Sequence, residues 1–449
     1  MKKYFILPVF AAVMIGLAGC GGEADASSRA DVSEQGIDPS VEDQPGNNPA
    51  VEDQSGDHVD SELEERQRDD RTQSLETYDE ETLVEGYLDY SMRLFAGSAK
   101  EGTNSMISPV SVMMALDMAA AGANGETQEQ ITDLFCKGAS QEQIENFCRE
   151  LMDRYESSQD VELHLANSVW IRDSAVDQIK EDYLVRTDDI FDAEAVIAPF
   201  DQTTVDAVNQ WCDDKTDGMI DKLLDEIDPR MQLILMNATA LDAPWQEPYM
   251  DYQVTEGTFT NAKGDAEDVK MLSGTESSYF ETQDAVGFMK YYEGGEYAFL
   301  AILPDESMTA DEYVRSLTGE KYMEFWNSRT NEYDVDTKMP EFTYEYELKL
   351  NDVLNDMGMT RAFQEDADFT GIAELADGLY IDTVLHKTFV EVGQNGTRAA
   401  AVTAVIMDCA SAEGPVERKQ VYLDRPFVYA IVEADTGMPL FIGTLQSAQ

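Results

Sequence analysis

Residues 396–411 read GTRAAAVTAVIMDCAS, a run of alanine, valine and threonine that begins at a glycine. The run favours a β-strand, and it carries only two charges in a chain whose formal net charge is -59. The residues that follow, 413–419, read EGPVERK and are typical of an exposed turn. A strand-forming segment therefore lies beside an exposed one, close to the C-terminus.

The segment has two distinct faces as a strand, because side chains alternate from one side to the other. One face is uncharged and consists of Thr397, Ala399, Ala401, Thr403, Val405 and Met407. The other carries charges only at its ends and consists of Arg398, Ala400, Val402, Ala404, Ile406 and Asp408. A slip of one residue would bury both charges without partners, so the register is specified. Burial of Val405 and Met407 alone is worth on the order of 3 to 5 kcal/mol.

The composition indicates a folded protein with an acidic surface. Asp and Glu number 90 against 31 Lys and Arg, which argues against nucleic acids or anionic lipid headgroups as partners and favours cationic ones. Hydrophobic residues make up 43% of the 449 residues and aromatic residues 9%, enough to fill a substantial core. The acidity is therefore expected on the surface and not in chain-wide disorder.

Residues 1–20, MKKYFILPVFAAVMIGLAGC, are predicted to be a lipoprotein signal peptide. Lys2 and Lys3 precede an apolar run that is too short for a stable membrane span. The final LAGC resembles the bacterial lipobox, in which the cysteine, here Cys20, carries the lipid. An ordinary signal peptide with an incidental cysteine is the alternative. The lipobox interpretation predicts an extracytoplasmic protein at a bacterial cell surface or envelope, which meets the membrane only through its N-terminal lipid.

Residues 21–79 are predicted to be a disordered acidic tether. They are rich in Asp, Glu, Ser, Gln, Gly and Pro, so they cannot bury enough apolar surface to offset chain entropy. PSVEDQPG, from residue 39, recurs as PAVEDQSG from residue 49, which suits a spacer. A flexible chain of this length spans roughly 40 Å. A single folded domain is expected over residues 80–449.

The cysteines and histidines predict no metal site and no cofactor. Apart from Cys20, the cysteines are Cys136, Cys148, Cys212 and Cys409. They form no CxxC pair, and the chain has only three histidines. Pairing of Cys136 with Cys148 stays open, since an exported protein can form disulfides but a large domain does not need one.

The hydrophobic periodicity predicts helices first and strands later. Helices are expected over residues 82–95, 111–121 and 348–357, with a further one from Thr127, where Thr127 and Gln130 would form a capping box. Strands are expected over residues 163–171, 233–241, 297–304, 380–392, 421–434 and 438–445. This order predicts an α+β fold with a large, mostly antiparallel sheet.

Motifs of catalytic sites are absent from the sequence. There is no GxSxG, HExxH, GxxxxGK[ST] or glycine-rich dinucleotide turn. His58 falls in the predicted tether, whereas His164 and His386 lie in strand-like apolar runs and are interpreted as core residues. The protein is therefore not expected to be an enzyme.

Several stretches, taken together and in order, resemble the serpin family. They are NSMISPVS from Asn104, GANGET from Gly122, NQW from Asn209, TDGMI from Thr216, LMN from Leu235 with Trp245, PEF from Pro340, MGM from Met357, ADFTGI from Ala367, and DRPF from Asp424 with Gly443. Each motif is weak alone. Their collinearity from residue 80 to residue 449 makes the resemblance specific.

The resemblance implies a fold of three β-sheets and eight or nine helices, with an exposed reactive loop near the C-terminus. In serpins a protease cleaves this loop and is acylated by it, and the loop then inserts into the large sheet as a new strand and distorts the protease; the resemblance implies the same mechanism here. The resemblance assigns the hinge, the segment at which the reactive loop begins, to Gly396, Thr397, Arg398, Ala399, Ala400, Ala401, Val402 and Thr403. Gln394, Asn395 and Arg398 stand where inhibitory members often have glutamate.

The family spacing places the reactive bond between Ala410 and Ser411, with Cys409 and Ala412 as the neighbours to which it could shift. Alanine fits a small apolar primary pocket, which implies elastase-like or subtilisin-like serine proteases. The acidic domain should attract cationic ones. An ordinary strand of the native sheet is the alternative for this segment, but an exposed apolar strand edge would invite aggregation.

The resemblance also assigns structural roles. Ser108, Ser111, Asn237 and His386 match the polar cluster, called the shutter, beneath the strands that part during insertion. Trp245 matches the tryptophan of the breach, at the top of the opening sheet. The protein is expected to be a monomeric protease inhibitor. A non-inhibitory serpin that serves as a binding or carrier module is the alternative.

Overall fold

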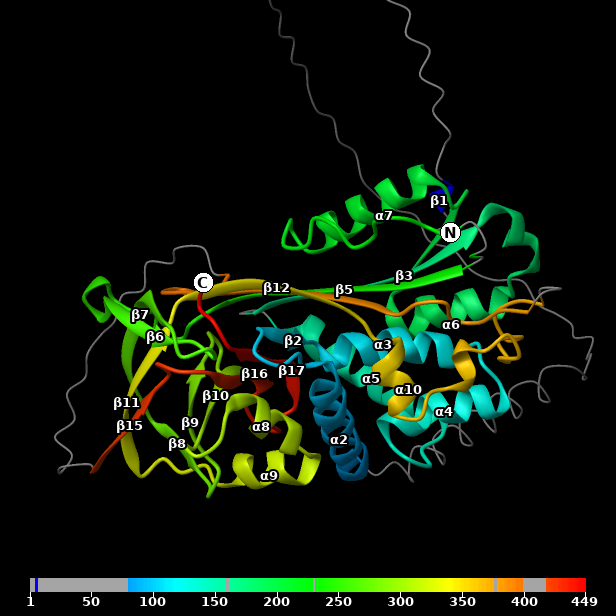
Figure 1. The fold of residues 1–449 in the computed structure, drawn as a ribbon. Coiled ribbons are helices and arrows are strands. Elements are labelled where there is room, and N and C mark those ends of the chain that lie inside the picture. The colour runs from blue at the N-terminus through cyan, green and yellow to red at the C-terminus, as the bar shows by residue number, and fades with distance from the viewer. Residues whose placement is uncertain are drawn as a thin grey trace, which may run out of the picture. The chain divides into compact units, whose positions relative to one another are not determined.

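The computed structural model describes residues 5–6, 80–158, 161–228, 231, 233–374, 378–398 and 417–449. These residues form three sheets with helices packed around them (Figure 1). The predicted α+β fold with three sheets is confirmed. The predicted tether and Cys20 lie outside the described residues.

The largest sheet has seven strands. Their order across the sheet is β1 (Phe5–Ile6), β4 (Glu194–Ala198), β3 (Glu162–Arg172), β5 (Leu233–Pro244), β14 (Gly396–Thr397), β13 (Leu385–Val392) and β12 (Phe342–Lys349). β3 and β5 form a long antiparallel pair in which Asn167 lies opposite Asn237. The two-residue strand β14 lies between β5 and β13 and pairs with both.

Two further sheets complete the β-structure. The six-stranded sheet has the order β2 (Ser105–Ile107), β17 (Pro439–Leu445), β16 (Phe427–Glu433), β10 (Tyr297–Pro304), β9 (Ala285–Tyr291) and β8 (Ser278–Glu281). The four-stranded sheet has the order β15 (Glu417–Tyr422), β11 (Tyr333–Pro340), β7 (Ala266–Glu276) and β6 (Val254–Thr260). Every residue of β10, β16 and β17 is buried, which explains their nearly continuous apolar sequence.

Nine α-helices lie within the described residues. They are α2 (Glu80–Ser98), α3 (Pro109–Ala120), α4 (Gly125–Phe135), α5 (Gln141–Ser157), α6 (Glu181–Phe191), α7 (Gln202–Lys215), α8 (Ala310–Ser316), α9 (Gly319–Asn327) and α10 (Asn351–Asp356). Three 3₁₀-helices are η1 (Asp173–Gln178), η2 (Asp251–Gln253) and η3 (Arg361–Phe363).

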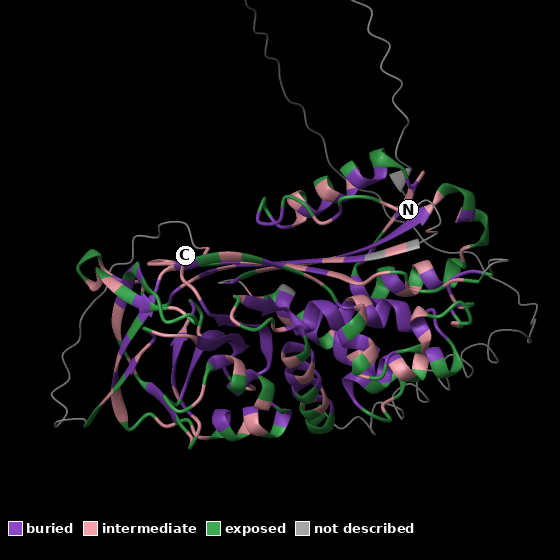
Figure 2. Ribbon diagram, viewed as in Figure 1, coloured by how far each residue is buried: buried purple, intermediate pink, exposed green. Residues whose placement is uncertain are grey.

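Two helices lie against opposite faces of the seven-stranded sheet. α3 reads PVSVMMALDMAA, is mostly apolar and buried on nearly every side, and packs between β5 and β17. α7 crosses the other face of the sheet (Figure 1). Its Val205, Val208 and Trp211 pack on Trp170 of β3 and Met236 of β5. Figure 2 shows exposed residues along the outer side of α7, while α3 is buried.

The sequence-based boundaries fail at four helices or strands. The single strand predicted over residues 421–434 is divided between β15, which ends at Tyr422, and β16, which begins at Phe427 in a different sheet. α4 begins at Gly125, so the capping box predicted at Thr127 is wrong: Thr127 Oγ1 accepts from the backbone N–H of Asp368, and Gln130 Oε1 from that of Arg361. The helix predicted from residue 348 begins at residue 351, because β12 continues to Lys349. The strand predicted from residue 380 begins at Leu385.

Cys136, Cys148 and Cys212 are free thiols and are buried. The pairing of Cys136 with Cys148, which the sequence left open, is therefore not formed. Across the described ranges, no helix is both long and apolar enough to span a membrane.

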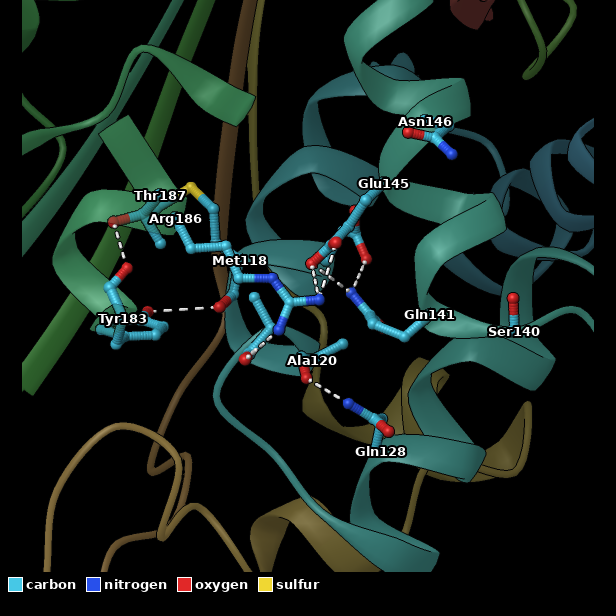
Figure 3. A network of polar contacts seen from close by, with 12 residues as sticks. Met118, Ala120, Gln128, Ser140, Gln141, Glu145, Asn146, Tyr183, Arg186 and Thr187 are labelled. Carbon is cyan, nitrogen blue, oxygen red and sulfur yellow. Dashed lines mark hydrogen bonds and ion pairs between the residues drawn. The ribbon is translucent and has the colours of Figure 1, made fainter. Parts of the chain in front are cut away.

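A buried polar network joins α3, α5 and α6 (Figure 3). Asp117, the only charged residue of α3, is fully buried and accepts from Gln141 Nε2 at 2.7 Å. Gln141 Nε2 also donates to Glu145, which pairs with Arg186 at 2.6 Å. Burial first, and then repulsion by Glu145, raise the pKa of Asp117 to about 7, whereas Gln141, the Cys148 thiol and Arg186 act in the opposite direction.

This network predicts a pH-dependent stability. The pKa of Asp117 lies above the usual aspartate value of 3.8, so the folded state holds this proton more tightly than the unfolded chain does. The wild type therefore loses stability as the pH rises from about 4 to about 7 and loses no more from this group above that. Asp117→Asn should become progressively more stable relative to the wild type across the same interval.

Thermal melting between pH 4 and pH 9 measures this difference. Asp153→Asn, at an exposed position of α5, is the matched control and should follow the wild type at every pH. A melting-temperature difference between Asp117→Asn and the wild type that does not vary with pH would contradict the prediction.

Candidate functional site

The chain reverses direction after β13 and re-enters the sheet as β14. Thr397 pairs with Val392 of β13 on one side and with Ala243 of β5 on the other, and Gly396 pairs with Pro244. Thr397 is 3% exposed. The first two residues of the segment 396–411 are therefore already a strand in the centre of the large sheet.

An aromatic pair holds the Thr397 side chain. Its Oγ1 lies 2.6 Å from the hydroxyl of Tyr292, which is itself buried. Tyr292 stacks on Trp245 with ring centroids 4.6 Å apart and planes 7° apart. Burial raises the pKa of Tyr292 well above its usual value, so this hydroxyl stays neutral and keeps its proton for a hydrogen bond.

Trp245 also holds the turn between β13 and β14. Its indole N–H donates to the carbonyl of Gly393 at 2.9 Å, and its backbone N–H donates to the carbonyl of Asn395 at 2.8 Å. Gln394 Nε2 donates to the carbonyl of Tyr249 at 2.8 Å, and the N–H of Tyr249 returns a bond to the carbonyl of Gln394 at 3.0 Å. A glutamate at this position could not donate to the Tyr249 carbonyl, because an ionised carboxylate only accepts.

Arg398 leaves the sheet on the side of α7. Its φ of 48° is in the left-handed region, which is uncommon for a residue other than glycine. The guanidinium donates to the carbonyls of Thr216 at 3.3 Å and Asp217 at 2.6 Å, immediately after the end of α7. Thr397 thus contacts Tyr292, while Arg398 contacts the residues that follow α7 on the other face of the sheet.

The four residues assigned to the shutter come together between α3 and the sheet. Ser108 caps α3, and its backbone N–H donates to His386 Nε2 at 3.0 Å. Ser111 Oγ bonds Asn237 Oδ1. Burial lowers the pKa of His386 to about 4, so the ring is neutral at pH 7 with Nε2 as acceptor, which leaves the proton on Nδ1.

Two further residues extend this cluster. Asn237 Nδ2 donates to Asn167 Oδ1 at 2.7 Å, and Thr239 Oγ1 donates to Asn237 Oδ1 at 2.9 Å. Asn167 in turn donates to the carbonyl of Phe191 at 2.8 Å. The sequence reasoning missed Asn167 and Thr239. The signal for Thr239 was its position two residues after Asn237 on the same face of β5, and the signal for Asn167 was a buried amide inside β3.

A cavity of about 160 Å³ borders the same cluster. Its lining includes Ser111 and Leu116 of α3, Met236 and Asn237 of β5, and His386 of β13. The cavity therefore lies between β5 and β13, the two strands that pair with β14, and next to α3.

The remaining predicted site residues are not all described. Cys20, residues 399–403 and residues 409–412 lie outside the described residues. His164, which the sequence placed in the core, is on β3 with its side chain 30% exposed and 3.8 Å from Glu162. Over the ranges that the structure describes, no three histidine, cysteine or acidic side chains gather as a metal-binding group.

Known proteins share this architecture. The family model described as serpin (serine protease inhibitor) matches residues 85–447. The chain is 29% identical over 373 residues to a serpin-like protein of Thermococcus kodakarensis, covering 82% of this chain and 86% of that protein. It is 30% identical over 362 residues to leukocyte elastase inhibitor A of Mus musculus, covering 77% of this chain and 93% of that protein.

The fold agrees with these sequence matches. The crystal structure of tengpin, a thermophilic serpin, in its native state has a TM-score of 0.76 and 39% sequence identity to this chain, covering 82% of this chain and 95% of tengpin. Because the family model extends over most of the chain and the fold matches as well, the protein belongs to the serpin family.

Proposed function

We propose that this protein inhibits serine proteases as a suicide substrate and traps them by inserting its reactive loop into the seven-stranded sheet. The observation that carries the proposal is the position of β14. Gly396 and Thr397 already pair with both β5 and β13, so the loop begins inside the sheet that it would enter. The protein acts as an inhibitor and not as an enzyme.

The surroundings of β14 fit continued insertion. The cavity of about 160 Å³ lies between β5 and β13, where later residues of an inserted strand would have to pass. The uncharged face of the segment, from Thr397 to Met407, would turn toward α3, in register with the buried Thr397. The Ser111–Asn237 and Ser108–His386 bonds join α3 to the two strands, and we assign them the role of a shutter that must rearrange as the strands part.

The chemical step is an interrupted proteolysis. The hydroxyl oxygen of the protease serine attacks the carbonyl carbon of Ala410, and the bond to Ser411 breaks. The amine of Ser411 leaves with the proton that the serine hydroxyl gives up through the protease's own base. An ester then joins Ala410 to the protease. Insertion of the loop distorts the protease before water hydrolyses the ester.

The target class follows from the loop and from the charge. Alanine before the cut fits a protease with a small apolar primary pocket, as in elastase-like or subtilisin-like enzymes. The name of the mouse relative describes an elastase inhibitor. An acidic inhibitor attracts cationic proteases and raises their association rate at low salt. We further propose that the protein works as a monomer, anchored through lipidated Cys20 outside the cytoplasm.

Loop insertion predicts that cleavage raises thermal stability. Limited proteolysis within residues 399–416 should raise the melting temperature by roughly 10 °C or more, because an inserted strand buries apolar side chains and gains backbone hydrogen bonds. Calorimetry of intact and cleaved protein measures the change. An unchanged melting temperature would favour the carrier alternative, in which the loop is cut without entering the sheet.

Trapping predicts a covalent complex. Incubation with a cationic elastase-like protease should give a band that survives denaturing electrophoresis in detergent, and mass analysis of the released C-terminal peptide should place the cut at Ala410 or within two residues of it. Recovery of cleaved protein with fully active protease and no complex would contradict the inhibitory mechanism.

Side chains of the loop would alternate between the two faces of the inserted strand, so a charge should be tolerated on the outward face and not on the face toward α3. Ala401→Glu places a carboxylate on the inward face, where burial without a partner disfavours insertion. Most of this variant should be cleaved as an ordinary substrate, with a several-fold higher number of inhibitor molecules consumed per protease. Ala400→Glu is the matched control on the outward face and should stay close to the wild type. Equal behaviour of the two variants would contradict the proposed register.

A further inference from the structure

Arg398, the third residue of the segment 396–411, contacts the C-terminal end of α7. We propose that Arg398 is a positioning residue: it holds the start of the loop against the C-terminal end of α7, and loop insertion requires this contact to be released. The inference rests on the proposed inhibitory function, which it deepens.

The end of α7 suits an arginine. The helix ends at Lys215, and Asp217 and Gly218 turn the chain away with φ values of 50° and 70°. Carbonyls at a helix C-terminus lack intrahelical partners and carry the negative end of the helix dipole. The fork of one guanidinium reaches the carbonyl of the C-cap residue Thr216, which also accepts from the N–H of Met219, and the carbonyl of the next residue, Asp217. A lysine ammonium is a single point charge without this fork.

The carboxylates around Arg398 add a weaker attraction. The Asp217 carboxylate is 3.7 Å from the guanidinium but is 82% exposed, so solvent screens this ion pair. Asp242 of β5 also interacts electrostatically with Arg398, although burial is the larger influence on its pKa and raises it. The two carbonyl bonds, and not the ion pair, are thus the main contact.

The backbone of Arg398 has to change for the loop to enter the sheet. Its φ of 48° directs the chain out of the sheet, whereas every residue of an inserted strand is extended. The backbone change moves the Cα–Cβ bond, so the present guanidinium bonds break as the strand grows. α7 lies over one face of the sheet (Figure 1), and its side chains pack with Met236 of β5 and Phe389 of β13, the two strands between which the loop would insert. The contact therefore joins the two parts that must move, the loop and the helix that covers its path.

The test compares three substitutions in the full-length protein. Arg398→Ala removes both carbonyl bonds, Arg398→Lys keeps the charge without the fork, and Asp217→Asn removes the exposed carboxylate but leaves both carbonyls in place. The rate of loop insertion is followed by tryptophan fluorescence after mixing with an elastase-like protease, since Trp211 lies on α7 and Trp245 contacts the hinge. Hydrogen exchange of the amides at residues 216–219 is measured separately, without protease.

Arg398→Ala should insert its loop several-fold faster than the wild type and should exchange the amides after α7 several-fold faster. The insertion rate and the amide exchange rate of Arg398→Lys should lie between those of Arg398→Ala and the wild type. Both rates of Asp217→Asn should match the wild type. An insertion rate that is unchanged or slower in Arg398→Ala, while the wild type inserts normally, would overturn the inference. If the wild type itself shows no insertion, the proposed function fails, and unchanged amide exchange in Arg398→Ala would then overturn the inference independently.

Discussion

Two strands at the centre of the large sheet, β5 and β13, are joined through a strand of two residues, and the rest of the structure depends on this pairing. Backbone N–H and C=O groups in a sheet interior need partners. Gly396 and Thr397 supply them at one end of the two strands, while a cavity of about 160 Å³ adjoins the same strands at the shutter. In the proposed mechanism, a longer strand from the same loop would extend this pairing along β5 and β13 and would add backbone hydrogen bonds as it grows.

The polar groups between α3 and the sheet bear on whether β5 and β13 could part as the proposed function requires. An apolar seam between α3 and the sheet would resist separation, since each exposed methylene costs about 0.8 kcal/mol. Asn237 instead bonds Ser111, Asn167 and Thr239, and these groups can exchange partners as the strands move. Tyr292 follows the same principle: its buried hydroxyl requires a partner, and Thr397 provides one only while the hinge is docked. In the proposed mechanism, hydrogen bonds that are satisfied but can exchange partners would hold β5 and β13 together until the loop inserts.

Local patterns in the sequence predict the strands well and the tertiary contacts poorly. The apolar run of residues 297–304 is β10, residue for residue, because its burial on both faces leaves no ambiguity in the pattern. Thr127 and Gln130 mislead because their side chains bond a segment more than 200 residues away, and local capping rules cannot register that competition. Four shutter positions were available from the family resemblance, but Asn167, Tyr292 and the Arg398 contact depend on how distant parts of the chain meet.

Three of the chain's few cations contact buried or hinge-adjacent groups inside the fold. Lys290 pairs with Glu276 while nearly buried and lies 4.4 Å from the ring of Tyr249, next to the hinge. Arg186 balances one of two buried acids beside α3, and Arg398 binds the end of α7. The Lys290–Glu276 and Arg186–Glu145 pairs each join one cation to one acid, so neither pair changes the net charge of the surface. Under the proposed function, salt would have two opposed effects: it would weaken the attraction of a cationic protease, and it would relieve the self-repulsion of the acidic fold. The first acts at long range on the encounter. The hinge contact with backbone carbonyls is short-ranged, so we expect it to keep its strength over the same range of ionic strength.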